Sequence, residues 1–243
     1  MEIKKLSRFA VETSLNCERC FVLQYKYKIS MPMLPFTLNI ACDGLVKNEF
    51  DYYRKKQEPH PIFIKHDIEA VPFDHPEMDN WRHNFKGAYC VDEENGFKAG
   101  GAVDDLWLKN DGSLIVADTK TTAKNIFNWD ETFEKYDYAR GYQRQLEFYQ
   151  YTYRQLGFEV ADEAYILYYN GRKNEDFFNQ QLTFDLHVIK LDCDAAWVKP
   201  AIIHARSLLD SDSLPEPSNT CDKCCYLKKR WQLSKKLSQE VSV

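Results

Sequence analysis

The chain has 243 residues, of which 44% are hydrophobic and 28% charged, and its 15 Phe and 15 Tyr supply a sizeable core that excludes wholesale disorder. The formal net charge of −5 excludes a histone-like sheath on nucleic acid, although it remains compatible with a local basic groove. No stretch approaches the ~18 consecutive apolar residues of a membrane helix, and no apolar signal core follows the first lysines, so we expect a cytoplasmic protein with no membrane partner.

The first third of the chain is dominated by helical patterns. Residues 7–28 predict short helical segments interrupted at residues 16–20, and residues 39–56 have the apolar periodicity of a longer helix. The proline-rich residues 58–76 predict loop or edge structure, and a short helix is expected over residues 77–85.

The rest of the chain combines strand-like runs with two helical patterns. Strand-like runs occupy residues 88–92, 97–108, 113–119, 163–170 and 182–191. A helix over residues 141–157 is expected to stop at Gly157, and a helix over residues 194–211 is expected to have Asp194 as its N-cap and a kink at Pro200. Helices flanking a central mixed β-sheet predict an α/β or α+β fold.

The stretch from Gly100 to Thr122 predicts one tight hairpin that carries acidic residues. Asn-Asp-Gly at positions 110–112 is a turn signal between apolar runs. With a three-residue loop, opposing residue numbers sum to 222 and Asp104 faces Asp118; with a two-residue loop the sum is 223 and Asp105 faces Asp118 instead. The turn chemistry leaves both registers open.

The acidic residues of this hairpin suit a cation. Two carboxylates that face each other repel unless a cation or a proton lies between them. Lys120 lies two residues beyond Asp118 and therefore projects from the same face. A lone aspartate more often caps a strand or makes a surface salt bridge. Three acids and a lysine on one hairpin favour a site for a hard divalent cation such as Mg²⁺ or Mn²⁺.

The hairpin also resembles a known family. "GAVD" at residues 101–104, followed by "VADTKTT" at residues 116–122, resembles the acidic core of the PD-(D/E)xK nuclease superfamily in its RecB-like branch. The resemblance implies that Asp104 and Asp118 bind the catalytic Mg²⁺ or Mn²⁺ and that Lys120 orients the attacking water. It selects Asp104 over Asp105, which becomes the natural control. It also implies a restriction-endonuclease-like core in a single domain that spans residues 1–243.

A second motif of the same branch lies on the helix that follows the hairpin. RecB-like nucleases carry Q-x-x-x-Y there, and "QLEFY" supplies Gln145 and Tyr149. Their i, i+4 spacing places both on one helix face, where they would hydrogen-bond DNA phosphates or brace the site. The alternative is that Tyr149 belongs to the core stripe with Leu146 and Tyr153.

One position departs from the family pattern. RecB-like nucleases usually place a metal-binding histidine in a G-x-x-H context on an early helix, and here Lys47 stands in that place. A protonated lysine cannot ligate a cation. Residues nearby in the sequence that could substitute for it are Glu49, Asp51, His60 and His66.

Cysteine pairs lie near both ends of the chain. Cys17 and Cys20 form one C-x-x-C, and Cys221 and Cys224 form another, with Cys225 as an alternative to Cys224. In a reducing compartment such pairs are more typical of thiolate metal sites than of disulfides. The resemblance to the CRISPR-adaptation and AddB-type nucleases implies a [4Fe–4S] cluster, with structural Zn²⁺ as the alternative. The basic tail beyond this pair is expected to be helical.

Together, these motifs imply a metal-dependent DNA nuclease that hydrolyses phosphodiester bonds. The branch implies action on single strands or duplex ends in DNA repair, recombination or defence, with a partner protein in such a complex. Gln145 and Tyr149 would position the substrate. Lys47 favours an alternative, a catalytically degenerate nucleic-acid-binding module or subunit. A third hypothesis is an enzyme on another scaffold, in which the acids serve unrelated chemistry.

Overall fold

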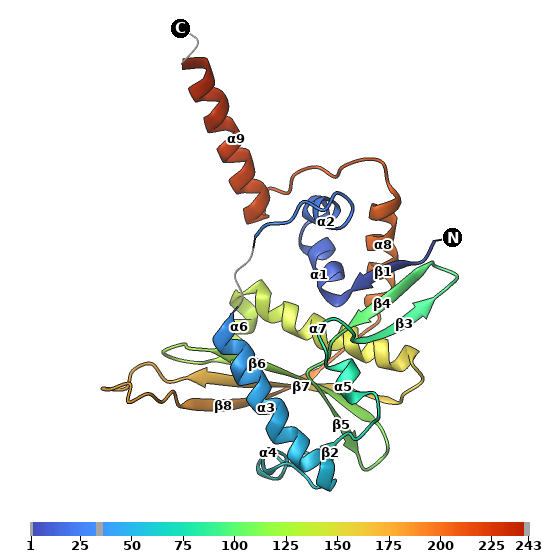
Figure 1. Cartoon of the computed structure of the whole chain (residues 1–243), viewed down its shortest axis with the longest axis vertical. Coiled ribbons are helices and arrows are strands. Elements are labelled where there is room, and N and C mark those ends of the chain that lie inside the picture. The colour runs from blue at the N-terminus through green and yellow to red at the C-terminus, as the bar shows by residue number, and fades with distance from the viewer. Residues whose placement is uncertain (1, 33–35, 241–243) are drawn as a thin grey trace.

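The computed structural model of the chain describes residues 2–32 and 36–240 (Figure 1). Within them, a five-stranded and a three-stranded sheet have helices packed against them, so the predicted mixed α/β fold is confirmed. No helix of these residues is long and apolar enough to cross a membrane.

The larger sheet carries the hairpin predicted from the sequence. Its strands in spatial order are β2 (Ala70–Pro72), β5 (Asp105–Lys109), β6 (Leu114–Thr122), β7 (Val160–Gly171) and β8 (Phe184–Asp192). The β6–β7 pair is parallel and the other pairs are antiparallel. β2 lies at the edge, as the proline-rich composition predicted.

Both faces of this sheet are buried, because its central strands alternate between two cores. In β6, Leu114 and Val116 belong to one core, whereas Ile115 and Ala117 belong to the other. The first core includes α7 (Asp137–Gln155), and the second includes residues of α3 (Thr37–Lys56) and α4 (Pro61–Lys65). Residues of β6 with even numbers therefore point toward α7.

The smaller sheet is formed by β1 (Lys4–Ser7), β4 (Phe97–Gly101) and β3 (Ala88–Asp92). The prediction of one strand over residues 97–108 is wrong, because the chain passes from β4 in this sheet to β5 in the larger one. Gly100 permits the close pairing with β3, since a Cβ there would lie 1.9 Å from the carbonyl oxygen of Ala88.

Helices near the two ends of the chain pack beside the smaller sheet (Figure 1). They are α1 (Arg8–Asn16), α2 (Glu18–Tyr25) and α8 (Val198–Asp210). The predicted interruption near residue 17 is confirmed, since α1 ends and α2 begins on either side of Cys17.

The remaining helices are α5 (Met78–Trp81), α6 (Trp129–Lys135) and the projecting α9 (Asp222–Glu240) (Figure 1).

The ends of α7 and α8 test the predictions made for these two helices. Gly157 has the positive φ of 91° expected where α7 ends. Asp194 is not the N-cap of α8, because that helix begins later, after Trp197. Pro200 lies in the first turn, where its missing N–H breaks no helical hydrogen bond, so the predicted kink has no cause.

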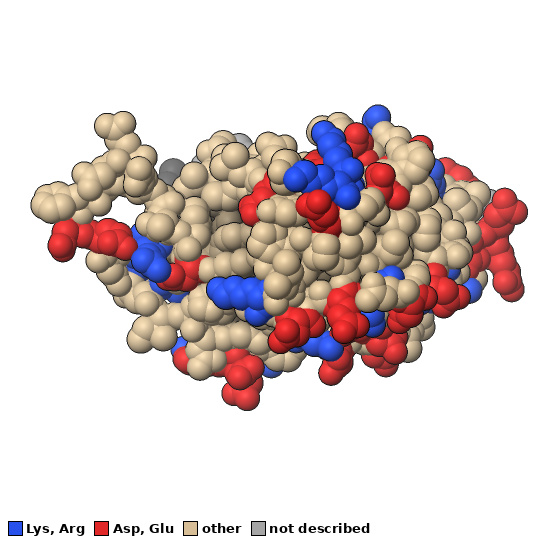
Figure 2. Space-filling model, turned by 90° about the horizontal axis from the view of Figure 1, so that it is seen from below, with Lys and Arg blue, Asp and Glu red and all other residues tan. Residues whose placement is uncertain are grey.

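Charges of both signs are mixed on the surface. On the face shown in Figure 2, Lys and Arg are interspersed with Asp and Glu, and no basic sheath covers that face of the described residues. This distribution agrees with the mildly acidic net charge.

Candidate functional site

The observed hairpin register decides between the two predicted alternatives. Leu106 pairs with Val116 and Leu108 with Leu114, so the residue numbers sum to 222. The loop has three residues, and the Lys109 amide donates to the Ser113 carbonyl oxygen over 2.9 Å. Asp104 immediately precedes β5, at the position opposite Asp118.

Asp118 and Lys120 lie on the α7 side of the sheet because they continue the even-numbered alternation of β6. The Asp118 side chain is only 2% exposed. Gln145 of α7 donates from Nε2 to Asp118 Oδ1 over 2.7 Å, and Lys120 Nζ forms an ion pair with Oδ2. Lys120 Nζ also lies 3.5 Å from Gln145 Oε1. Gln145 therefore braces both charged groups.

Asp104 is held by the main chain of the neighbouring strand. The Thr119 amide donates to Asp104 Oδ2 over 2.9 Å, and Lys47 Nζ lies 3.4 Å from Oδ1. The hydroxyl of Tyr149 donates to the carbonyl oxygen of Ala102 over 2.6 Å, which fixes the turn leading into Asp104. Tyr149 is thus both a core residue and a brace, so the two predicted roles coincide.

The two carboxyl groups titrate differently because their surroundings differ. Burial, together with the adjacent Asp104, raises the pKa of Asp118 to about 7, although Lys120 opposes this. Burial would also raise the pKa of Asp104, but Lys47, Lys120 and the Thr119 amide outweigh it and hold that pKa below its usual value. Asp118 is therefore the member of the pair that takes up a proton near neutral pH, while Asp104 stays ionised.

Lys47 is part of this cluster, together with an acid that the sequence analysis missed. Lys47 Nζ lies 2.8 Å from Oδ2 of Asp43, one turn earlier on α3. Burial would lower the pKa of Lys47, but Asp104 and Asp43 outweigh it and raise it, so the side chain stays an ammonium. The i, i+4 spacing from Lys47 was the sequence signal that could have found Asp43.

The residues considered as substitutes for the family's histidine do not join the cluster. Glu49 contacts His60 at 3.1 Å, and Asp51 forms ion pairs with Arg82 and Arg54. None of the four substitutes, including His66, lines the pocket beside the carboxylates.

Asp105 faces the other side of the sheet. Its carboxylate pairs with the guanidinium of Arg54 over 2.7 Å, and both side chains are nearly buried. A mutation there would leave a buried charge unpaired, so Asp105 is a poor control for catalysis.

A pocket of about 360 Å³ opens beside the cluster. It is lined by Asp104, Asp118, Lys120, Gln145 and Tyr149, all predicted from the sequence. Other lining residues were not predicted: Ser7, Arg8, Phe9, Asn84 and Tyr89. They come from segments distant in sequence, and no local motif marks them.

The carboxylates fit a hard divalent cation. Asp118 Oδ2 is buried and, among the residues the structure describes, accepts no hydrogen bond, although it touches the Lys120 ammonium. Asp104 offers a second carboxylate on the same side of the sheet. Paired carboxylate oxygens at a pocket are the donors that Mg²⁺ and Mn²⁺ prefer.

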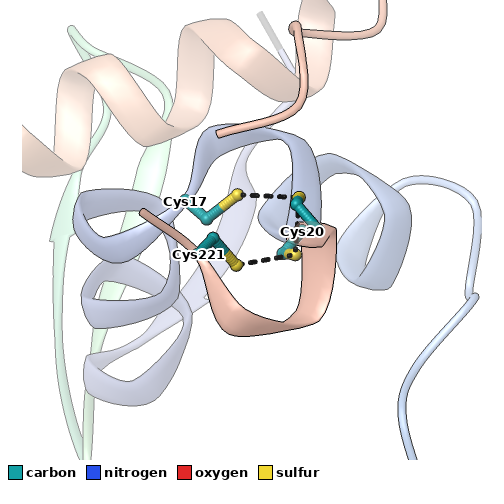
Figure 3. Close-up of side chains that lie close together, drawn as sticks. Cys17, Cys20 and Cys221 are labelled. Carbon is teal, nitrogen blue, oxygen red and sulfur yellow. Dashed lines mark hydrogen bonds between the residues drawn. The ribbon is translucent and has the colours of Figure 1, made fainter. Parts of the chain in front are cut away.

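The cysteine pairs form a second potential metal site (Figure 3). The sulfur atoms of Cys17, Cys20, Cys221 and Cys224 all lie within 4.8 Å of one another. The Cys17–Cys224, Cys20–Cys221 and Cys20–Cys224 separations are 3.6, 3.7 and 3.7 Å. Cys225 turns away, and its sulfur lies 3.2 Å from the Asn219 carbonyl oxygen.

Solved structures offer remote likenesses only. The crystal structure of SSO0001 has 12% identity and a TM-score of 0.39, with 88% of this chain and 80% of that chain covered. An alkaline exonuclease (LHK-Exo) from Laribacter hongkongensis has 13% identity and a TM-score of 0.38, with 96% of this chain and 94% of that chain covered. A comparison with curated proteins found no significant match.

A comparison with protein families is more informative. The model described as the PD-(D/E)XK nuclease superfamily matches residues 39–228. The matched segment includes the hairpin carboxylates, Lys120 and the α7 residues Gln145 and Tyr149. Because the family model matches well over half of the chain, the chain belongs to the PD-(D/E)XK nuclease superfamily.

Proposed function

We propose that this protein is a Mg²⁺- or Mn²⁺-dependent DNA nuclease of the RecB-like branch, folded as one domain over residues 1–243. The observation that carries the proposal is the convergence of Asp104, Asp118 and Lys120 at one pocket, braced by Gln145. Membership of the nuclease superfamily supports phosphodiester hydrolysis.

Each residue of the cluster has a role in this proposal. Asp104 and Asp118 would hold the cation, which supplies a Lewis acid that polarises a phosphoryl oxygen and activates water. Lys120 places a positive charge beside the attacking water and the scissile phosphate. Gln145 holds the side chains of Asp118 and Lys120 in place, and Tyr149 holds the turn that leads into Asp104.

For the cysteine site, the sulfur spacing favours a single ion. Four thiolates around one Zn²⁺, with Zn–S bonds of about 2.3 Å, lie about 3.8 Å apart. Three of the six sulfur separations, at 3.6, 3.7 and 3.7 Å, are close to that spacing, and all six are within 4.8 Å. In a [4Fe–4S] cluster each cysteine binds a different iron, so the thiolates lie farther apart. We therefore propose structural Zn²⁺, which would fasten α2 to the start of α9.

The metal content of anaerobically purified protein tests this assignment. One zinc per chain and a colourless preparation are expected. A brown preparation with about four irons per chain would contradict the assignment and support the cluster implied by the resemblance.

Cleavage of DNA tests the enzyme itself. Purified protein with its cysteine metal intact is incubated with Mn²⁺ and with end-labelled single-stranded or linear duplex DNA. We expect degradation that an Asp118→Ala variant lacks. If the wild-type chain degrades neither DNA faster than this variant, the proposal fails.

A second candidate is a nucleic-acid-binding module without catalysis. It is favoured by Lys47, whose ammonium lies 3.4 Å from Asp104 and competes with a cation for that carboxylate. DNA binding that is unchanged by Asp104→Ala, with no cleavage in Mg²⁺ or Mn²⁺, would support it over the enzyme. In either case a partner protein and a role in repair, recombination or defence stay predictions.

A further inference from the structure

A row of tyrosines leads away from the catalytic cluster. The Tyr142 and Tyr138 ring centroids are 5.7 Å apart, and those of Tyr138 and Tyr136 are 5.4 Å apart. We call Tyr136, Tyr138 and Tyr142 the tyrosine row. It begins at the catalytic lysine, because Lys120 Nζ lies 4.8 Å from the centre of the Tyr142 ring.

The row and the active site share one face of α7. Tyr138, Tyr142, Gln145 and Tyr149 follow spacings of four, three and four residues, which align them along a helix. The face that braces Asp118 through Gln145 therefore continues toward the start of the helix as an aromatic surface.

The outer end of the row is exposed and carries positive charge. Tyr136 and Tyr138 are 40% and 42% exposed, whereas Tyr142 is half-buried. Lys124 Nζ lies 5.5 Å from the centre of the Tyr136 ring and 5.7 Å from that of Tyr138. Aromatic rings interleaved with lysines are the surface that unpaired bases and their phosphates require.

A second pocket continues from this end. It has a volume of about 410 Å³, and its lining includes Lys124, Tyr136, Ile126 and Lys173, together with one acid, Glu131. Ile126 is 84% exposed. The two lysines give this pocket a net positive lining, which suits a phosphate backbone.

We propose that the tyrosine row and Lys124 form a track that binds an unpaired segment of nucleic acid next to the reacting phosphodiester. The inference rests on the proposed nuclease function and specifies the form of its substrate. Unpaired bases offer free faces to the rings, whereas the bases of a duplex cover each other. The track therefore selects single strands or frayed ends.

Binding without cleavage tests the track. All variants are made in an Asp118→Asn background, and binding of fluorescein-labelled oligothymidylate and of a hairpin-capped duplex is measured by anisotropy. The variant Tyr136→Leu/Tyr138→Leu keeps apolar volume but removes both ring faces. We expect its affinity for the oligothymidylate to fall about tenfold or more, and its affinity for the duplex to change less than twofold.

Two further variants separate stacking from general effects. Tyr136→Phe/Tyr138→Phe keeps the rings and is expected to bind oligothymidylate within about threefold of the parent. Tyr52→Leu is the matched control, because Tyr52 is 55% exposed and has Lys56 Nζ 4.2 Å from its ring centre, yet it lies outside the row. It is expected to bind like the parent.

Lys124 gives an independent readout through salt dependence. The variant Lys124→Gln is expected to lower the slope of log affinity against log salt by about 0.7, the value for one lost phosphate contact with a single strand. Lys124 Nζ also donates to Thr132 Oγ1 over 2.8 Å, so thermal unfolding of this variant is recorded alongside.

The outcomes separate this inference from the proposed function. Unchanged oligothymidylate binding by the Leu variant, or an equal loss of duplex binding, would overturn the track even if the wild-type protein cleaves DNA. Absence of cleavage by the wild-type protein would overturn the nuclease and leave the binding comparison intact.

Discussion

The residues of the carboxylate cluster lie on or next to strands and helices that pack into the two hydrophobic cores. The cysteine site instead joins segments from near opposite ends of the chain. In the cluster, Asp118 has Lys120 and Gln145 as partners, and Asp104 has Lys47. In the cysteine site, Cys20 Sγ lies 3.7 Å from the sulfur atoms of Cys221 and Cys224, and burial and the neighbouring thiols raise its pKa. We therefore expect the first site to keep its shape without a metal and the second to depend on one.

This difference predicts that loss of the metal abolishes catalysis at the carboxylate cluster, whereas loss of the metal from the cysteine site lowers the stability of the fold. The largest effect is expected from Asp104→Asn, which keeps an acceptor for the Thr119 amide but removes the charge that attracts the cation. Cleavage of labelled DNA in Mn²⁺ should fall by about 10³-fold or more, with the thermal midpoint nearly unchanged.

Asp212→Asn is the matched control for this variant, because its side chain is fully exposed and far along the chain from the hairpin. It should cleave at the wild-type rate. Residual cleavage by Asp104→Asn above about one tenth of wild type would show that Asp104 does not hold the catalytic cation.

At the cysteine site, Cys17→Ser should release the metal and lower the thermal midpoint by about 10 °C, since a structural ion contributes several kcal/mol to folding. Cys225→Ser is the matched control, because its sulfur contacts main-chain carbonyls outside the four-sulfur cluster. It should retain the metal. Metal content and thermal unfolding are measured for both variants. Loss of the metal from Cys225→Ser would show that Cys225 is a ligand and would contradict the four-cysteine assignment.

Local patterns predicted the geometry of the hairpin but not its surroundings. The alternation along β6 correctly placed Asp118 and Lys120 on one face, and the turn residues limited the register to two choices. The observed register places Asp104 opposite Asp118, and Asp105 instead pairs with Arg54, which lies 51 residues before it and reaches it only through tertiary packing.

Long-range pairing explains the other omissions. β1 has four residues and is stabilised by parallel pairing with β4, some 93 positions later, so no local periodicity marks it. Residues 97–108 were predicted as one strand, but they divide between β4 and β5 because these strands belong to two different sheets. Asp43 joins the carboxylate cluster because α3 brings Lys47 to Asp104, which a helical pattern alone does not specify.

The raised pKa of Asp118 predicts a pH dependence at the first site. Because burial raises the pKa of Asp118 to about 7, a cation must displace a proton below that pH. Mn²⁺ affinity, measured by calorimetry, should fall about tenfold for each pH unit below 7 and level off above it.

The stability of the metal-free protein should change in the opposite sense. A carboxyl group with a raised folded pKa contributes stability that is present below its unfolded pKa and is lost as pH rises through about 7. The thermal midpoint without divalent ions should therefore decrease across this range. In Asp118→Asn both dependences should flatten, and a pH profile that persists there would assign the titration to another group.

Lys47 tests how strongly an internal cation competes with the metal. The variant Lys47→Met removes the ammonium that lies 3.4 Å from Asp104, so Mn²⁺ affinity should increase about tenfold. Lys56→Met, on the same helix but with an exposed side chain, is the control and should bind Mn²⁺ like wild type. Weaker Mn²⁺ binding by Lys47→Met would mean that the ammonium supports the site instead of competing with the metal.

The smallest effect is expected at the brace of the turn. Tyr149→Phe keeps the ring in the core but removes the hydrogen bond to the Ala102 carbonyl oxygen, so the free energy of unfolding should fall by about 1 kcal/mol. Because the turn positions Asp104, cleavage should slow several-fold while the metal at the cysteines is retained. A Tyr149→Phe variant that lost stability but cleaved at the wild-type rate would show that the hydroxyl supports the core alone, and that the strand pairing of Asp104 with the Thr119 amide suffices to hold the carboxylate in place.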